Sequence, residues 1–170
     1  MITHERLLYL LNYDPVTGNL TWKNPTSNRV KIGDIAGYKS KDYVTVRLDK
    51  ILYPAHCVIW FGMTGVWPEN EIDHKDLDKY NNKWVNLREA TPSLNGANKN
   101  KYITNKSGFK GVSWSKRRKA WLAQITVNYK TINLGCYDTP EKAADVYKQA
   151  SEKHFGSFSN TSELVQKAMM

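Results

Sequence analysis

The sequence predicts an α+β protein made of two parts, and three observations lead to this fold class. Residues 71–98 follow the order strand, loop, strand, helix. Residues 108–160 contain three strand-like segments and then one helical segment, which predicts a three-stranded antiparallel sheet packed on one helix. The 170 residues are 41% hydrophobic and 24% charged, which is typical of globular chains and enough for one ordinary domain or two small ones.

The amino-terminal elements are short and separated by turn residues. Residues 3–12 predict a helix, because four leucines form a broad apolar face and Thr3 stands where an N-cap is expected. Residues 13–18, Tyr-Asp-Pro-Val-Thr-Gly, predict a turn, since proline presets φ and glycine permits positive φ. Strands are expected at 19–23 and at 43–48, where apolar and polar residues alternate.

The middle of the chain continues with a turn and a second helix. Asp49-Lys50 predicts the turn, and residues 55–62 predict a helix that glycines close. Residues 71–74 and 84–87 predict two short strands on either side of a polar loop. Thr91-Pro92 then opens a helix, with threonine as N-cap and proline at the first helical position.

The carboxy-terminal part shows strand periodicity followed by helix periodicity. Asp138 or Thr139 caps the helix, with Pro140 near its first position, and Gly156 ends it. The second of the two hairpin turns falls at residues 128–130. The three expected strands are residues 108–115, 120–127 and 131–137.

The positive charge is concentrated in the second part of the chain. The net charge is +9, with 25 basic and 16 acidic residues. Residues 1–100 contribute +2 and residues 101–170 contribute +7, and residues 99–119 hold eight basic residues without an acidic one. A basic surface of this kind favours nucleic acid as the partner, the alternative being a solvated linker.

Cysteine usage and hydropathy favour an intracellular protein. Cys57 and Cys136 form no paired motif, which argues against a disulfide scaffold or a cysteine-based zinc site. No apolar run approaches the ~20 residues of a membrane span, so no membrane partner is expected. The first residues also lack the basic-then-apolar order of a signal peptide.

Three polar residues within the predicted strand–loop–strand–helix segment have side chains suited to hydrolysis. Asp73 offers a carboxylate oxygen and Asn95 an amide oxygen, and such oxygens suit Mg²⁺. His74 offers an imidazole, whose ordinary pKa of ~6.5 allows it to accept a proton from water near neutral pH. Neighbouring strand residues point to opposite faces, so Asp73 and His74 share a site only if the strand ends there.

These residues, together with Asn86-Leu87-Arg88 and Thr91, resemble the HNH nucleases, and most closely the phage and intron-encoded homing endonucleases. The resemblance covers about residues 5–100 and implies a ββα-metal fold. It implies Asp73 and Asn95 as ligands of one Mg²⁺ or Mn²⁺ ion, and His74 as general base. Because the motif ends in asparagine and not histidine, it favours these ions over zinc.

The same resemblance assigns supporting roles around the site. Asn86 is expected to hold the loop across the two strands without taking part in the chemistry. His56 is expected to support the site, with a metal-ligand role as the alternative. Asn82 and Asn98 are further candidates to brace the site.

Residues 108–160 resemble the ethylene-response-factor (apetala-type) DNA-binding domains. The similarity lies in Gly108-Phe109-Lys110-Gly111-Val112, in the segment 121–125, and in the helix segment 141–150. It implies a sheet that lies in the major groove and a basic turn that contacts phosphates. The expected DNA-binding residues are Lys99, Lys101, Lys110, Ser113, Ser115, Lys116, Arg117, Arg118, Lys119, Gln124, Thr126, Thr131 and Asn133.

The sequence therefore predicts a two-domain, phage-type DNA endonuclease that acts as a monomer on double-stranded DNA in the cytoplasm of a bacterial host, with nicking favoured. The expected domains are 1–100, with a ββα core at about 70–100, and 108–160. A basic linker at 101–107 joins them, and 161–170 form a tail. The alternatives are a non-catalytic DNA-binding protein that retains the fold, and, less favoured, an RNA-binding module.

Overall fold

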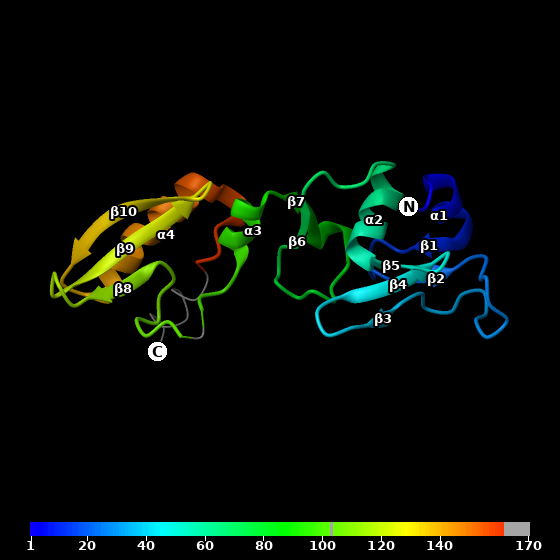
Figure 1. Cartoon of the computed structure of the whole chain (residues 1–170), viewed down its shortest axis with the longest axis horizontal. Coiled ribbons are helices and arrows are strands. Elements are labelled where there is room, and N and C mark those ends of the chain that lie inside the picture. The colour runs from blue at the N-terminus through cyan, green and yellow to red at the C-terminus, as the bar shows by residue number, and fades with distance from the viewer. Residues whose placement is uncertain (103, 162–170) are drawn as a thin grey trace. The chain divides into compact units, whose positions relative to one another are not determined.

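The computed structural model describes residues 1–102 and 104–161, and the predicted tail lies outside the described residues except for Thr161. The chain divides into two compact units, an amino-terminal unit, Met1–Ala90, and a carboxy-terminal unit that starts at Thr91. Both units combine helices and strands (Figure 1). None of the helices in the described part of the chain has the length and hydropathy needed to cross a membrane.

The amino-terminal unit contains two helices and three small antiparallel sheets. The sheets pair β1 with β2, β4 with both β3 and β5, and β6 with β7. Its elements are α1 (His4–Leu10), β1 (Leu11–Tyr13), β2 (Leu20–Trp22), β3 (Tyr38–Lys39), β4 (Val44–Leu48), β5 (Ile51–Pro54), α2 (Ala55–Thr64), β6 (Glu71–His74), the 3₁₀ turn η1 (Trp84–Asn86) and β7 (Leu87–Ala90).

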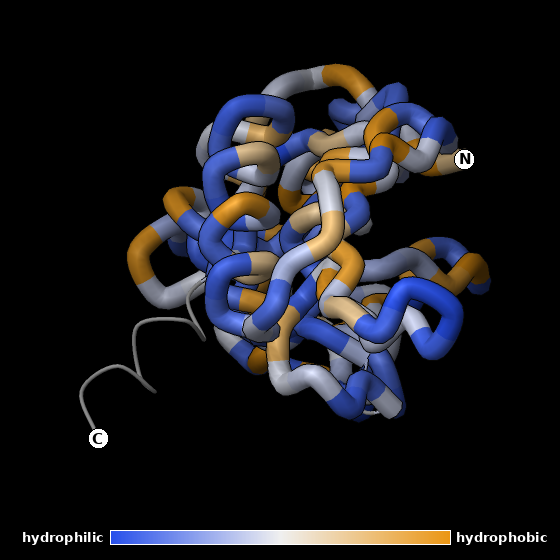
Figure 2. The backbone as a smooth tube through the Cα atoms, turned by 90° about the vertical axis from the view of Figure 1, so that its left-hand side faces the viewer, coloured by the Kyte–Doolittle hydropathy of each residue, from blue (hydrophilic) through white to orange (hydrophobic). Residues whose placement is uncertain are grey.

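Helix α2 forms the centre of this unit. It contacts α1, β4, β5 and β6. Val58 and Ile59 are almost fully buried, in one cluster with Leu10 of α1 and Val46 of β4. Hydrophobic residues occur along the backbone in short stretches separated by polar ones (Figure 2), and tertiary packing gathers them into this core. The core thereby fixes the start of α2, where His56 lies, beside β6.

The structure corrects two predicted elements in this unit. The first helix ends at Leu10 because residues 11–13 pair with β2, with Leu11 opposite Trp22. The strand predicted at 84–87 is η1 followed by β7, because Asn86 turns its side chain and carbonyl to the loop before it. The turn predicted at Asp49-Lys50 is confirmed, with φ values of 44° and 71°, whereas β5 after it was not predicted.

The carboxy-terminal unit is a three-stranded antiparallel sheet in the order β10-β9-β8 with a helix on one face (Figure 1). The predicted three strands and helix are present. Thr139 is the N-cap of the helix, and its side chain accepts from the backbone N–H of Lys142. The elements are α3 (Pro92–Asn98), β8 (Val112–Ser115), β9 (Ala120–Val127), β10 (Lys130–Tyr137), α4 (Pro140–Phe155) and the 3₁₀ turn η2 (Gly156–Phe158).

Strand β8 is shorter than predicted, starting at Val112 and not at residue 108. Gly111 has a φ of 71°, outside the range of a strand, and its Cα lies against the ring of Tyr147, where no Cβ would fit. The sheet packs on α4 through the buried Ala123, Ala143 and Ala144. This close approach leaves the opposite face of the sheet uncovered by α4.

Helix α3 is grouped with the carboxy-terminal unit, whereas the sequence pattern assigned it to the amino-terminal domain. Its Ala97 is buried in one cluster with Ile125, Tyr147 and Phe155. The Oγ of Ser93 accepts a hydrogen bond, 3.0 Å long, from the backbone N–H of Asn128. These contacts make α3 part of the sheet-and-helix unit.

Candidate active site and nucleic-acid interface

His74 is the last residue of β6, and it is buried beside an asparagine from the following loop. Its exposed fraction is 4% and that of the preceding Asp73 is 5%. The Nε2 of His74 lies 3.1 Å from the Oδ1 of Asn82. An amide oxygen only accepts hydrogen bonds, so Nε2 carries the hydrogen and Nδ1 keeps the lone pair. Asn82 therefore selects the tautomer whose basic nitrogen is Nδ1.

Two further aromatic rings surround His74. The ring of His56, on α2, lies 5.2 Å from it in an edge-to-face arrangement, and Tyr43 stacks on it at 6.3 Å. Burial, reinforced by the neighbouring His74, lowers the pKa of His56 to about 4. The Nδ1 of His56 is buried without a hydrogen-bond partner among the described residues. The structure thus places the rings of His56 and His74 in contact, and adds Tyr43, which no sequence signal had indicated.

Asp73 contacts a different group from those around His74. Arg88 stands opposite it on β7, and both Nε and Nη2 of Arg88 lie 2.9 Å from its Oδ2. A guanidinium pair of this geometry fixes the orientation of the carboxylate. Arg88 belongs to the sequence motif, but no role was predicted for it there.

Asn86 is hydrogen-bonded to the loop between the two strands. Its Nδ2 donates to the Oδ1 of Asp76 at 2.9 Å and to the carbonyl of Asn81 at 2.8 Å. Its Oδ1 accepts from the backbone N–H of Asp76 at 3.1 Å. Burial acts to raise the pKa of Asp76, but the hydrogen bonds from Asn81 and Asn86 and its other polar contacts together outweigh it, so the pKa is lowered. Asn86 thereby restrains the loop that carries Asn82.

The turn at residues 13–18 supports Asn82 from the other side. The hydroxyl of Tyr13 donates to the carbonyl of Asn82 at 2.8 Å, and the carbonyl of Pro15 accepts from the backbone N–H of Trp84 at 3.2 Å. Gly18 has a φ of 80°, and a Cβ there would lie 2.6 Å from the backbone nitrogen of Lys83. The turn at residues 13–18 therefore contributes to tertiary packing, since Gly18 permits the loop of Asn82 to approach it.

Asn95 and Asn98 lie on α3, in the carboxy-terminal unit. Thr91 caps this helix as predicted, accepting from the backbone N–H of Leu94. Asn98 is buried, and its carbonyl accepts from the Nδ2 of Asn160 at 2.7 Å. The pairing of Asp73 with Asn95, like the bracing role of Asn98, stays a prediction. Within the described residues, no three side chains of His, Cys, Asp or Glu gather into a metal-binding cluster.

The predicted base-contacting residues share one face of the carboxy-terminal sheet. The register places Gln124 opposite Asn133 and Thr126 opposite Thr131, whose hydroxyls are 3.1 Å apart. Ser113 and Ser115 lie on the same face, because they alternate with the buried Val112. This face is opposite the one that packs on α4. The basic turn, Lys116, Arg117, Arg118 and Lys119, is exposed next to it.

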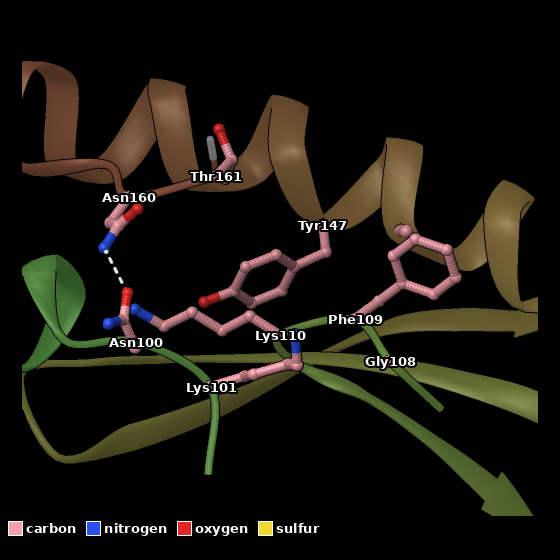
Figure 3. Close-up of a pocket in the computed structure, with 9 residues that line it drawn as sticks. Asn100, Lys101, Gly108, Phe109, Lys110, Tyr147, Asn160 and Thr161 are labelled. Carbon is pink, nitrogen blue, oxygen red and sulfur yellow. Dashed lines mark hydrogen bonds between the residues drawn. The ribbon is translucent and has the colours of Figure 1, made fainter. Parts of the chain in front are cut away.

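Lys110 differs from the other predicted DNA-binding residues, because its ammonium is engaged inside the unit. Its Nζ donates to the carbonyls of Ala97 and Lys99, both at 2.6 Å, at the carboxy-terminal end of α3. Its side chain runs beside Tyr147 (Figure 3), and burial lowers its pKa to about 8. This capping role was not predicted. Lys99 is exposed and Lys101 half-buried.

Comparisons with known proteins agree with the motif in the middle of the chain. A family model described as HNH endonuclease matches residues 53–97. Protein 3.8 of Escherichia phage T7 is 36% identical over 100 residues, covering 58% of this chain and 83% of that protein. The uncharacterized HNH endonuclease L560 of Acanthamoeba polyphaga mimivirus is 36% identical over 87 residues, covering 51% of this chain and 44% of its own length. No solved structure matches the chain.

Proposed function

Since the chain matches the HNH endonuclease family over residues 53–97 and belongs to one family with Protein 3.8 of phage T7, we propose that it is a metal-dependent endonuclease that cuts double-stranded DNA. The observation that carries this proposal is the imidazole of His74 held by Asn82 directly after a buried aspartate. In phosphodiester hydrolysis, an oriented imidazole can act as general base, and a carboxylate next to it can hold the metal ion.

In the proposed reaction, Nδ1 of His74 accepts the proton from the attacking water. The water oxygen forms a bond to phosphorus while the bond from phosphorus to the leaving oxygen of the sugar breaks. As His74 takes up the proton, the hydrogen bond from its Nε2 to Asn82 becomes a bond from a charged donor, and such bonds are stronger than neutral ones. Asn82 thus stabilises the imidazolium that the reaction forms.

The residues proposed to hold one Mg²⁺ or Mn²⁺ ion are Asp73 and Asn95. Their donor set is two oxygens, which fits these hard ions. Arg88 contacts the Oδ2 of Asp73, and a carboxylate offers about four lone-pair directions in all, so a carboxylate in an ion pair can also bind a metal ion. A divalent ion there would supply positive charge to the scissile phosphate and the leaving oxygen.

We assign DNA binding to the open face of the carboxy-terminal sheet. Six polar side chains on that face can donate to and accept from base edges, and the exposed basic turn can neutralise phosphates. This surface would make cleavage site-selective, as in homing-type enzymes. We propose that the chain acts as a monomer that nicks one strand, inside the infected host cell, as its phage and viral relatives suggest.

The proposal is tested by incubating the full chain with supercoiled plasmid, with Mg²⁺ or with a chelator. We expect nicked circles with Mg²⁺ only, and no cleavage by Asp73→Asn or Asn95→Ala, both of which should still bind DNA. Asp145→Asn, an exposed change on α4, serves as the control and should cut like the parent. Binding without cleavage by the parent under every metal condition would instead support the non-catalytic alternative.

A further inference from the structure

A cavity in the carboxy-terminal unit adjoins the proposed DNA-binding face. Its volume is about 430 Å³, within the ~300–1,000 Å³ that small-ligand pockets span. Its walls come from α3, the segment after α3, β9 and α4. Gln124 and Thr126 belong both to its wall and to the open face of the sheet, so the cavity borders the surface to which DNA binding is assigned.

The residues around the cavity combine positive charge, aromatic rings and amides. Lys99, Lys101 and Lys110 line it, and none of the described residues that line it is acidic. Tyr102 and Tyr129 line it and expose 84% and 83% of their surface, so neither ring is packed in the hydrophobic core. Figure 3 shows Lys101 and Lys110 near the ring of Tyr147, at a small neighbouring cavity that shares these residues. Cations beside stacking surfaces suit a nucleotide.

The backbone conformation of Tyr129 also favours a binding role for this residue. Asn128 and Tyr129 form the two-residue turn between β9 and β10, with φ values of 47° and 63°. Turns of this kind favour asparagine first and glycine second, and a bulky aromatic residue at positive φ is an outlier. A tyrosine that is strained and exposed does not serve folding, and such outliers gather at binding sites.

We propose that this cavity holds an unpaired nucleotide of the DNA substrate. The base would stack on Tyr129, with its edge toward the amide of Gln124 and the hydroxyl of Thr126. Lys99 and Lys101 would neutralise the adjoining phosphates. This inference rests on the proposed DNA-binding function, but it does not require cleavage.

The test measures binding of the full chain in chelator, where no cleavage occurs. The probes are a perfect duplex and the same duplex with one extra, unpaired 2-aminopurine nucleotide, whose fluorescence falls on stacking. We expect the parent to bind the bulged duplex more tightly and to quench the probe. Stacking on one aromatic ring corresponds to about a 5- to 150-fold gain in affinity, so Tyr129→Gly should lose roughly that preference and keep its affinity for the perfect duplex.

The variant separates a binding role from a structural one, because Tyr129→Gly relieves the positive φ and should leave the melting temperature equal or higher. Tyr38→Ala, an exposed tyrosine on β3, is the matched control and should behave as the parent. Equal affinity of the parent for both duplexes, or a preference retained in Tyr129→Gly, would refute the nucleotide pocket. Neither outcome touches the nuclease proposal, which the plasmid assay tests by itself.

Discussion

The hydrogen bond between His74 and Asn82 makes the most specific prediction about the mechanism. The variant Asn82→Ala removes the acceptor that selects the tautomer and stabilises the protonated ring. A hydrogen bond from a charged donor contributes about 1.5–3 kcal/mol, and each 1.36 kcal/mol in the barrier is tenfold in rate. We therefore expect single-turnover plasmid cleavage to slow roughly 10- to 150-fold, with DNA affinity unchanged.

The companion variant Asn82→Asp replaces the amide that accepts from His74 with a negatively charged carboxylate. A carboxylate next to the ring stabilises the imidazolium, so the acid limb of the rate profile should move to higher pH than in the parent. Asn81→Ala is the loop control, because the Nδ2 of Asn81 donates to Asp76 and not to His74. A parent-like rate in Asn82→Ala, or an unmoved acid limb in Asn82→Asp, would refute the assignment of His74 Nδ1 as the base.

Three further predictions concern stability and DNA affinity. The pKa of His56 is lowered from 6.5 to about 4, so on acidification the unfolded chain binds a proton before the folded chain does. The free energy of unfolding should therefore fall by up to about 3 kcal/mol from pH 6.5 to 4. His56→Gln should flatten that fall in denaturant titrations. The pKa of Lys110 is lowered from 10.5 to about 8, so as the pH rises the folded chain loses this proton before the unfolded chain does. The free energy of unfolding should therefore rise from pH 8 to 10.5, by about 1–2 kcal/mol after allowing for solvent screening. Lys110→Met should lack this rise. Replacing the four basic residues at 116–119 with glutamine should weaken DNA binding for all sequences and flatten the salt dependence, by about 0.9 in log–log slope for each phosphate that is no longer neutralised.

Elements governed by local chemistry were predictable from the sequence. The N-caps Thr91 and Thr139 and the strand at 120–127 occur where the pattern places them. Periodicity failed where tertiary contacts decide the backbone, as at residues 84–87. There the apolar residues suggest a strand, but the hydrogen bonds of Asn86 to the preceding loop hold the chain in a 3₁₀ turn.

The sequence motif proposes residues for the candidate site, but it does not give the contacts that hold them. The motif proposed His74 and Asn82, and the structure shows the hydrogen bond between them and adds the ring of Tyr43, which stacks on His74. Sequence alone could suggest that Asn82 braces the site, but it could not show that the Oδ1 of Asn82 faces Nε2. That geometry depends on Tyr13 and Gly18, far away in the chain, which position the loop of Asn82.

The contacts of α3 place this helix in the carboxy-terminal unit and not in the predicted amino-terminal domain. This helix carries Asn95, the proposed metal ligand, yet its contacts are with the sheet and α4 of the carboxy-terminal unit. Lys110 binds the carbonyls at its end, and Asn128, in the turn of the proposed nucleotide pocket, donates to Ser93 at its start. The turn that would grip DNA is therefore hydrogen-bonded to the helix that would hold the metal. Because a seven-residue helix is unstable by itself, α3 depends on these contacts within the carboxy-terminal unit.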